Sequence, residues 1–142
     1  DKKYVRQLIE TMKSYSISTK VKFFGRINEP KKLELMRKAH LLLHASIREG
    51  WGLVVIEAGS QGTPSVVYNV SGLRDSVVNN KTGIVLSENT SKDMAKEALL
   101  LFKNKKLYRK FQENALKRAK DLKWDDVTKQ SLDLIKKAAK NG

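Results

Sequence analysis

The clearest regularity in the sequence is the recurrence of apolar residues every three or four positions, the spacing that gathers them on one face of an α-helix. Near the N-terminus, Tyr4, Leu8 and Met12 follow this spacing. Asn28 is a typical N-cap residue, and Pro30 fits the first turn of the helix that it would start. The pattern predicts helices at residues 2–14, 28–39, 53–59, 91–103, 105–121 and 125–139.

Short apolar runs separate the first of these helices, and each has the length of a strand. They occur at residues 21–24, 41–43, 65–68 and 83–86. Because strands and helices alternate, we expect an α/β fold, a Rossmann-like parallel sheet with flanking helices and a helical C-terminal tail. The run 41–43 is apolar throughout, which predicts a strand buried on both faces. Ligands of such sheets bind where strands end and helices begin, so the glycine-bearing loop 44–52 is the candidate site.

The composition fits one folded domain and narrows the chemistry. The chain has 142 residues, of which 40% are hydrophobic and 31% are charged, a balance that supports a core. It contains no cysteine, which excludes disulfides, thiolate metal sites and a cysteine nucleophile. The sequence has no apolar run of the roughly 20 residues that a membrane-spanning helix needs. It does not begin with the apolar segment of a secretion signal, so we expect a cytoplasmic protein.

The charge is strongly positive and concentrated towards the C-terminus. The net charge is +14, of which residues 1–90 contribute +6 and the shorter stretch 91–142 contributes +8. A basic surface attracts phosphate groups, whether in nucleic acid, in anionic lipid or in a small phosphorylated ligand. Few aromatic residues accompany the C-terminal lysines, and the patterns of RNA-binding and zinc-finger domains are absent, so nucleic acid is the less favoured partner. A solvated, lysine-rich surface is the alternative interpretation.

The candidate loop has the features of a phosphate-binding turn. In residues 46–57, Gly50 and Gly52 flank Trp51 directly before a predicted helix. Glycine allows the backbone to approach a ligand closely. The first turn of a helix carries N–H groups without internal partners and the positive end of the helix dipole. This combination favours phosphate binding.

Two carboxylates flank this turn. Glu49 lies in the loop, and Glu57 lies in the second turn of the predicted helix. A carboxylate can accept two hydrogen bonds at once, which suits the neighbouring hydroxyls of a ribose or a hexose. The arrangement therefore fits a nucleotide-diphosphate sugar. In the alternative interpretation, Glu49 is a surface residue of the loop and Glu57 is paired with an arginine or a lysine.

Six groups of motifs, spread over nearly the whole chain, occur in the order known from one enzyme family. They are VKFFG at 21–25, HAS at 44–46 with EGWG at 49–52, EA at 57–58 with GTPSVV at 62–67, SGLRD at 71–75, TGIV at 82–85 and Trp124. Together they resemble the C-terminal, donor-binding domain of GT-B fold glycosyltransferases, in the large retaining group 1 (family 4 type) that carries the E-x7-E motif. Ala45 departs from that pattern, because the family usually has proline there.

The resemblance implies a role for each site residue. Glu57 would bind the ribose hydroxyls, and Glu49 would act at the reacting sugar by holding one of its hydroxyls. Arg26 would lie along the base, although an exposed loop position is an equal alternative. Trp51 would line the sugar pocket or pack beneath the loop, and His44 would support the loop. Main-chain N–H groups would bind the sugar and the diphosphate, and they belong to Gly50, Trp51, Gly52 and Leu53.

The reaction implied is transfer of a hexose, with retention, from a UDP-, GDP- or ADP-sugar to a glycan or lipid-linked acceptor. Amides and the helix dipole would stabilise the departing diphosphate, so neither a metal nor a cofactor is expected. The resemblance assigns no nucleophile. Peripheral contact with the cytoplasmic membrane face would follow from a lipid-linked acceptor. Two alternatives stay open: a non-transferase of the same fold, such as a sugar-nucleotide epimerase, and a basic module that binds nucleic acid or an anionic membrane.

The resemblance begins late in the family pattern. A complete donor-binding domain has two earlier strands, so residues 1–142 are expected to be a partial nucleotide-sugar-binding domain of a longer protein. The N-terminal acceptor domain would be absent, and the chain alone would be inactive. In the doubly wound order, the two absent strands would lie between residues 21–24 and 41–43. Because buried backbone groups need partners, we predict that these strands pair directly or that another chain fills the gap.

Overall fold

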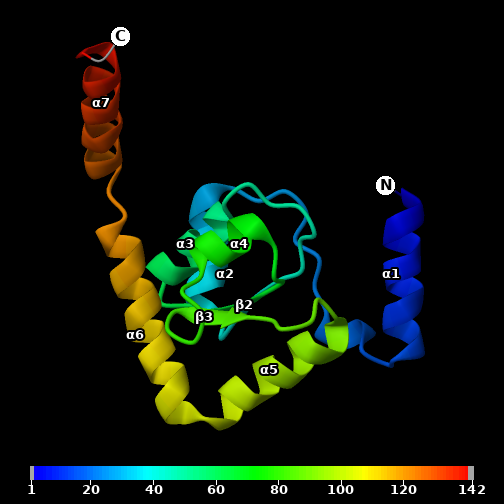
Figure 1. Ribbon diagram of the computed structural model, residues 1–142. Helices are drawn as coiled ribbons and strands as arrows, with labels where there is room; N and C mark the ends of the chain where they lie inside the picture. Colours follow the sequence, from blue (N-terminus) through cyan, green and yellow to red (C-terminus); the bar gives the residue numbers. More distant parts are fainter. Residues whose placement is uncertain (1, 141–142) are drawn as a thin grey trace.

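The computed structural model describes residues 2–140, and its elements alternate through the first part of the chain before ending in three helices (Figure 1). The helices and strands are, in chain order, α1 (Lys2–Ser14), the 3-10 turn η1 (Ser18–Lys20), α2 (Glu29–Lys38), β1 (Leu42–His44), α3 (Leu53–Ser60), β2 (Ser65–Val67), α4 (Ser71–Ser76), β3 (Gly83–Val85), α5 (Ser91–Lys103), α6 (Lys105–Asp121) and α7 (Trp124–Lys140).

The three strands form a parallel sheet in the order β1-β2-β3. Leu43 pairs with Val66, and Val66 pairs with Ile84, so the strands lie in register across the sheet. Helix α3 connects β1 to β2, and α4 connects β2 to β3. The predicted α/β fold with a parallel sheet and a helical tail is confirmed.

The central strand β2 is buried on both faces because helices cover each side of it. On one face, Val66 packs in a cluster with residues of α5 and α6, including Leu101 and Phe111. On the other face, Val67 packs with Val55 of α3 and with residues of α4 and the segment after it. Removing these apolar side chains from water is the main stabilising contribution to the fold.

Helix α3 packs very closely on α6. A side chain on Gly59 would place its Cβ 3.2 Å from the carbonyl oxygen of Ala115. Both residues are buried. The two helices therefore meet closely at this point, and a methyl group on Gly59 would fit only if the Ala115 backbone gave way slightly.

The residue predicted to cap a helix, Asn28, does so. The Asn28 side chain accepts a hydrogen bond of 3.0 Å from the N–H of Lys31, with Pro30 in the first turn of α2. Asn104 has the same role at the start of α6, where its side chain accepts a bond of 3.0 Å from the N–H of Leu107. These bonds satisfy N–H groups that a helix leaves open at its start.

The strand predicted at residues 21–24 is wrong. This segment has no regular secondary structure, and Val21, Phe23 and Phe24 are 40%, 56% and 42% exposed. A strand is held by hydrogen bonds to a neighbour, and within residues 2–140 the sheet offers none here. The predicted direct pairing with the next strand is therefore wrong as well, and the filling of that place by another chain stays a prediction.

The edge position of β1 explains a second difference. Residues 41–43 were expected to be buried on both faces, but the strand is Leu42–His44 and Leu43 is 51% exposed. The strand that is buried throughout is β2, which has a neighbour on each side. The prediction fails for β1, since burial depends on cover from other elements and not on the strand's own composition.

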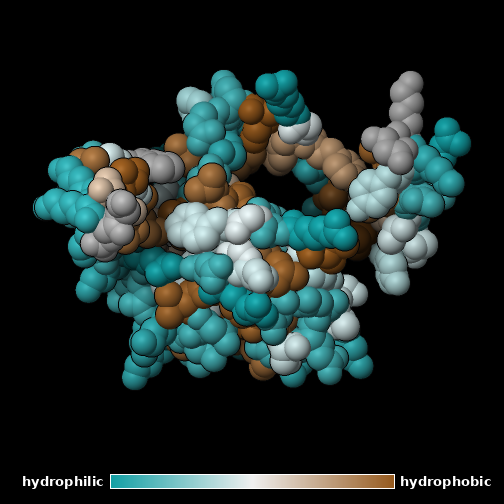
Figure 2. All heavy atoms as spheres, turned by 45° about the horizontal axis from the view of Figure 1, so that its top comes forward, coloured by the Kyte–Doolittle hydropathy of each residue, from teal (hydrophilic) through white to brown (hydrophobic). Residues whose placement is uncertain are grey.

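The first and last helices extend from the body on opposite sides of it, α1 on the right and α7 on the left of Figure 1. Their predicted ranges are confirmed within a residue at each end. Both helices expose apolar side chains, with Tyr4 and Val5 on α1 and Leu134 and Ile135 on α7 among the most exposed. Figure 2 shows hydrophobic residues at several places on the surface, some around the opening between the body and its right-hand part.

Candidate functional site

The loop that joins β1 to α3 lies at the carboxyl end of β1, as predicted. It ends in Gly52, the N-cap of α3, which has a φ of +74° in the left-handed region. A Cβ at this position would lie 2.8 Å from Cδ2 of Leu73. Both the backbone angle and the crowding therefore require glycine here.

The start of α4 supports the loop from beneath. Gly72 is buried, and a Cβ on it would collide with the carbonyl oxygens of Glu49 and Gly50. The loop backbone thus rests directly on the backbone of α4. Ser46 adds a hydrogen bond within the loop, because its hydroxyl donates to the carbonyl oxygen of Arg48 over 2.7 Å.

Glu49 is held by the last residue of β1. Its Oε2 lies 3.0 Å from Nε2 of His44, which fits the supporting role predicted for this histidine. The hydrogen bond with His44 is the main reason why the pKa of Glu49 lies below its ordinary value of 4.5, and backbone hydrogen bonds from Gly52 and Gly50 act in the same direction. The side chain of Glu49 is 28% exposed, so the carboxylate is fixed and still reachable from solvent.

Glu57 is held from a different helix. Its Oε2 lies 2.8 Å from Nζ of Lys32 on α2, and the same ammonium group lies 2.9 Å from Oε2 of Glu29. Hydrogen bonds with Glu57 and then with Glu29 raise the pKa of Lys32. Pairing of Glu57 with a lysine was the alternative interpretation of this residue, and it is the contact found here. The side chain of Glu57 is 33% exposed, so the pair lies at the surface.

The start of α3 presents main-chain donors beside the loop. The N–H of Val55 donates to the carbonyl oxygen of Gly52 over 2.9 Å. The preceding amides, of Leu53 and Val54, lie before the first residue that has a helical acceptor. No acidic residue occupies this first turn, so the positive end of the helix dipole is not offset there.

Trp51 lines an apolar groove beside the loop. The groove has a volume of about 310 Å³ and lies between α3 and the connection from α6 to α7. Its other apolar lining residues are Leu53, Ile56, Leu122 and Val127. The sequence left open whether Trp51 lines the sugar pocket or packs beneath the loop, and lining this groove does not decide between the two.

Arg26 is the predicted site residue that the structure ties least to the others. It is exposed, follows Gly25 and lies three residues before α2 begins. No hydrogen bond or ion pair within residues 2–140 joins it to Glu49 or Glu57. The other predicted site residues lie on the loop and on α3.

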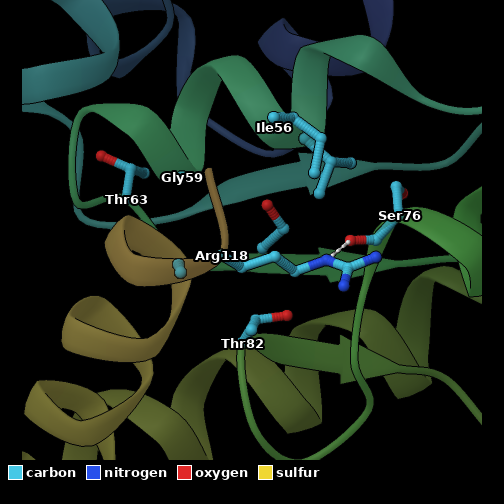
Figure 3. A pocket seen from close by; sticks show the side chains of 9 residues that line it. Ile56, Gly59, Thr63, Ser76, Thr82 and Arg118 are labelled. Atoms are coloured by element: carbon cyan, nitrogen blue, oxygen red, sulfur yellow. Dashed lines mark hydrogen bonds between the residues drawn. The ribbon is translucent and has the colours of Figure 1, made fainter. Parts of the chain in front are cut away.

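A small polar cavity lies on the other side of α3, between α3, α4 and α6 (Figure 3). Arg118 reaches into it from α6 and donates to the carbonyl oxygens of Ser76, over 3.1 Å, and Asp75, over 2.7 Å. The cavity has a volume of about 10 Å³, which leaves room for roughly one water molecule. Arg118 therefore fastens α6 to the end of α4, and this cavity is part of the structure and not a ligand site.

Sequence analysis did not single out Lys32. It lies in a lysine-rich first turn of α2, where nothing distinguishes it from its neighbour Lys31. Only the packing of α2 beside α3 brings it to Glu57.

Within residues 2–140 we find no cluster of three or more side chains that could hold a metal ion. None of the helices in that range has the length and apolar character that crossing a bilayer requires.

Comparison with known proteins agrees with this geometry. The family model described as glycosyl transferases group 1 matches residues 1–118. A D-inositol 3-phosphate glycosyltransferase of Rhodococcus erythropolis is 28% identical over 134 residues, which are 94% of this chain and 30% of that protein. Among solved structures, sucrose-phosphate synthase from Thermosynechococcus elongatus has a TM-score of 0.83 at 23% identity, over 96% of this chain and 35% of that one.

HepE of Anabaena, solved in complex with UDP and glucose, has a TM-score of 0.86 at 21% identity, over 96% of this chain and 37% of that one. At such identities the structural likeness concerns the fold. The chain spans about a fifth to a third of the length of the curated relatives that it matches. The fold expected for the donor-binding domain of GT-B glycosyltransferases is therefore confirmed.

Proposed function

Because this chain belongs to the glycosyl transferases group 1 family, we propose that it forms the donor-binding part of an enzyme that transfers a hexose from a nucleotide-diphosphate sugar. The observation that carries the proposal is the position of loop 45–52. It joins the carboxyl end of β1 to the start of α3, with Glu49 in the loop and Glu57 on the helix. Parallel sheets bind nucleotides at the carboxyl ends of their strands.

In this proposal each part of the donor has a matching group. Glu57 accepts hydrogen bonds from the ribose hydroxyls, since its contact with Lys32 uses Oε2 and leaves Oε1. Glu49 accepts a hydroxyl of the transferred hexose. The main-chain N–H groups from Gly50 to Leu53 donate to the sugar and the diphosphate, those of Gly50 and Gly52 in exchange for their bonds to Glu49. Arg26 lies along the base.

The reaction breaks the bond between the anomeric carbon and the diphosphate oxygen and forms one to an acceptor hydroxyl, whose proton passes to the departing diphosphate. The group 1 resemblance supports retention of configuration at the anomeric carbon. The developing charge on the diphosphate is stabilised by the amides and dipole at the start of α3, which is why we propose a metal-independent reaction with no cofactor. A structural neighbour that holds UDP and glucose makes UDP-glucose the first donor to test, ahead of GDP- and ADP-sugars.

For the acceptor we propose a glycan or a lipid-linked sugar, reached from the cytoplasmic membrane face. The bend between α5 and α6, at the lower edge of Figure 1, supports a peripheral contact with anionic lipid. Residues 99–110 contain five basic and no acidic residues. Three apolar side chains of the same stretch are 45% to 59% exposed, namely Leu99, Leu100 and Phe102. Exposed apolar groups among cations are typical of surfaces that lie on a membrane.

Titration calorimetry of the chain with UDP-glucose, a GDP-sugar and an ADP-sugar tests the donor role. We expect one of them to bind, and Glu57→Ala to weaken that binding at least about tenfold, because it removes a charged hydrogen-bond acceptor. Glu34→Ala is the matched control, since Glu34 is a surface glutamate whose ion pairs lie within α2. Unchanged affinity in Glu57→Ala would contradict the ribose assignment.

Sedimentation with lipid vesicles separates the membrane contact from donor binding. We expect binding to anionic vesicles that falls with added salt, and little binding to zwitterionic ones. Replacing Lys105, Lys106 and Arg109 by glutamine should abolish it and leave the donor affinity unchanged. Equal binding to both vesicle types would contradict this part of the proposal. A chain that binds nucleic acid or lipid but no nucleotide sugar would instead be the basic module considered above.

A further inference from the structure

Lys32 occupies a different position from the lysine next to it. Its ammonium group lies 2.8 Å from Glu57 Oε2 on α3 and 2.9 Å from Glu29 Oε2 on its own helix. The ammonium group of Lys31, one residue earlier, pairs with Glu34 of the same helix, and no ion pair within residues 2–140 joins it to α3. Lys32 is therefore the cation that links α2 to the helix at which the donor is proposed to bind.

We propose that Lys32 is a positioning residue for the donor site: it fixes the carboxylate of Glu57 so that the remaining oxygen, Oε1, faces the ribose hydroxyls. This inference rests on the proposed function. A glutamate side chain rotates about three bonds and loses that freedom when it binds a ligand. An ammonium group that already holds Oε2 removes part of this loss before the ligand arrives, which strengthens binding.

The ion pair between Lys32 and Glu57 contributes little to holding α2 in place. The other end of α2 is fixed by Thr63, whose hydroxyl donates to the carbonyl oxygen of Met36 over 2.6 Å. The Lys32 and Glu57 side chains are 30% and 33% exposed, and ion pairs this close to solvent contribute little to folding stability. Because Glu29 also contacts the ammonium group, Lys32 keeps an ion-pair partner when the ligand forms hydrogen bonds with Glu57.

The test is calorimetric titration of the chain with UDP and UDP-glucose. We expect Lys32→Met to weaken UDP binding about threefold to tenfold, the range that ordering one long side chain costs. Lys31→Met, on the same helix turn, should bind as the unmodified chain does. Lys32→Arg should restore most of the affinity, because it keeps a cation within reach of Glu57. Thermal unfolding of all three variants should be nearly unchanged.

A double-mutant cycle decides whether Lys32 acts through Glu57. If it does, Lys32→Met combined with Glu57→Gln will bind no more weakly than Glu57→Gln alone. Additive losses would overturn the inference, and so would tighter binding by Lys32→Met, which would mean that the ammonium group competes with the ribose.

The two proposals fail in different ways. If the unmodified chain binds no nucleotide, the proposed function fails and the role of Lys32 falls with it. If the chain binds UDP and Glu57→Gln weakens that binding, but Lys32→Met and Lys31→Met behave alike, only the role of Lys32 is overturned. Should Lys32→Met unfold, Lys32→Gln and Lys31→Gln take the place of the methionine variants, and an equal loss of affinity in both would reject the inference.

Discussion

The ring of His44 holds the carboxylate of Glu49, with Nε2 and Oε2 3.0 Å apart. His44 is the last residue of β1, a rigid element, and Glu49 lies on the loop that follows. The strand therefore fixes the side chain of an acid whose backbone belongs to the loop. Placing a functional group through a neighbour on a strand is more exact than relying on loop geometry.

Replacing His44 should affect the sugar and not the nucleotide. In the proposed site, Glu49 contacts the hexose, so His44→Ala should lower the affinity for UDP-glucose about threefold to tenfold. The affinity for UDP should stay the same. Calorimetry with both ligands measures this difference. His40→Ala is the control, because His40 is exposed and contacts the ring of Phe102 instead. An equal loss for UDP and UDP-glucose would reject this role.

Acid should weaken the fold partly through Glu49. Its pKa is lowered in the folded chain, mainly by the hydrogen bond with His44. A carboxylate whose pKa is lowered by folding stabilises the fold above its ordinary value, 4.5, and loses that contribution as the pH falls through the lowered pKa. Melting curves should therefore show a smaller loss of stability below pH 4.5 in Glu49→Gln than in the unmodified chain.

Glu34 offers an internal comparison for that experiment. Hydrogen bonds from Lys38 and then Lys31 lower its pKa to about 2. Its contribution should persist to more acidic solution, so Glu34→Gln should differ from the unmodified chain down to about pH 2. If Glu49→Gln and the unmodified chain lose stability in parallel, the contact with His44 does not form in solution.

A methyl group at Gly72 should displace the loop. The new Cβ would meet the carbonyl oxygens of Glu49 and Gly50, which are backbone atoms and cannot rotate away. We expect Gly72→Ala to lower the free energy of unfolding by about 1–3 kcal/mol, the usual cost of overpacking. Denaturant unfolding measures it. Gly50→Ala is the matched control, since no heavy atom lies within 4 Å of its added Cβ. Equal stabilities would contradict the close packing.

Hydrogen exchange should distinguish residues 21–24 from the sheet. The segment has no regular secondary structure and exposes Val21, Phe23 and Phe24. The amides of β2 bond to neighbouring strands and are fully buried. Amides 21–24 should therefore exchange rapidly in the isolated chain, and those of Val66 and Val67 should exchange slowly. Strong protection at 21–24 would mean that this segment pairs in solution.

Much of the fold could be predicted from local patterns. The helices at 2–14, 91–103 and 105–121 were predicted with their observed bounds, because apolar periodicity is a local signal. The segment 21–24 has equally apolar residues and no strand forms, since a strand needs a partner that its own sequence does not supply. Helix α4 was not predicted, because its six residues are too few to show a period.

The site was predictable only in part for a related reason. Glu49, Glu57 and the glycines lie within nine residues of one another, so their spacing and the family motif identify them from sequence alone. Lys32 is 25 positions away from Glu57, and only the packing of α2 against α3 brings it there. Trp51 stood out in the motif, yet the sequence did not show that it shares a groove with Leu122 and Val127.

The backbone contact between Gly59 and Ala115 has a consequence for how the site could change its selectivity. Because Gly59 lets α3 lie close against the backbone of α6, the helix that carries Glu57 is packed firmly on its neighbour. Adjustment to a different sugar would then fall to side chains of the loop and of α2, which a few substitutions can alter while the frame is kept. Engineering of donor choice is best directed at those exposed positions, and variation at Gly59 is best avoided.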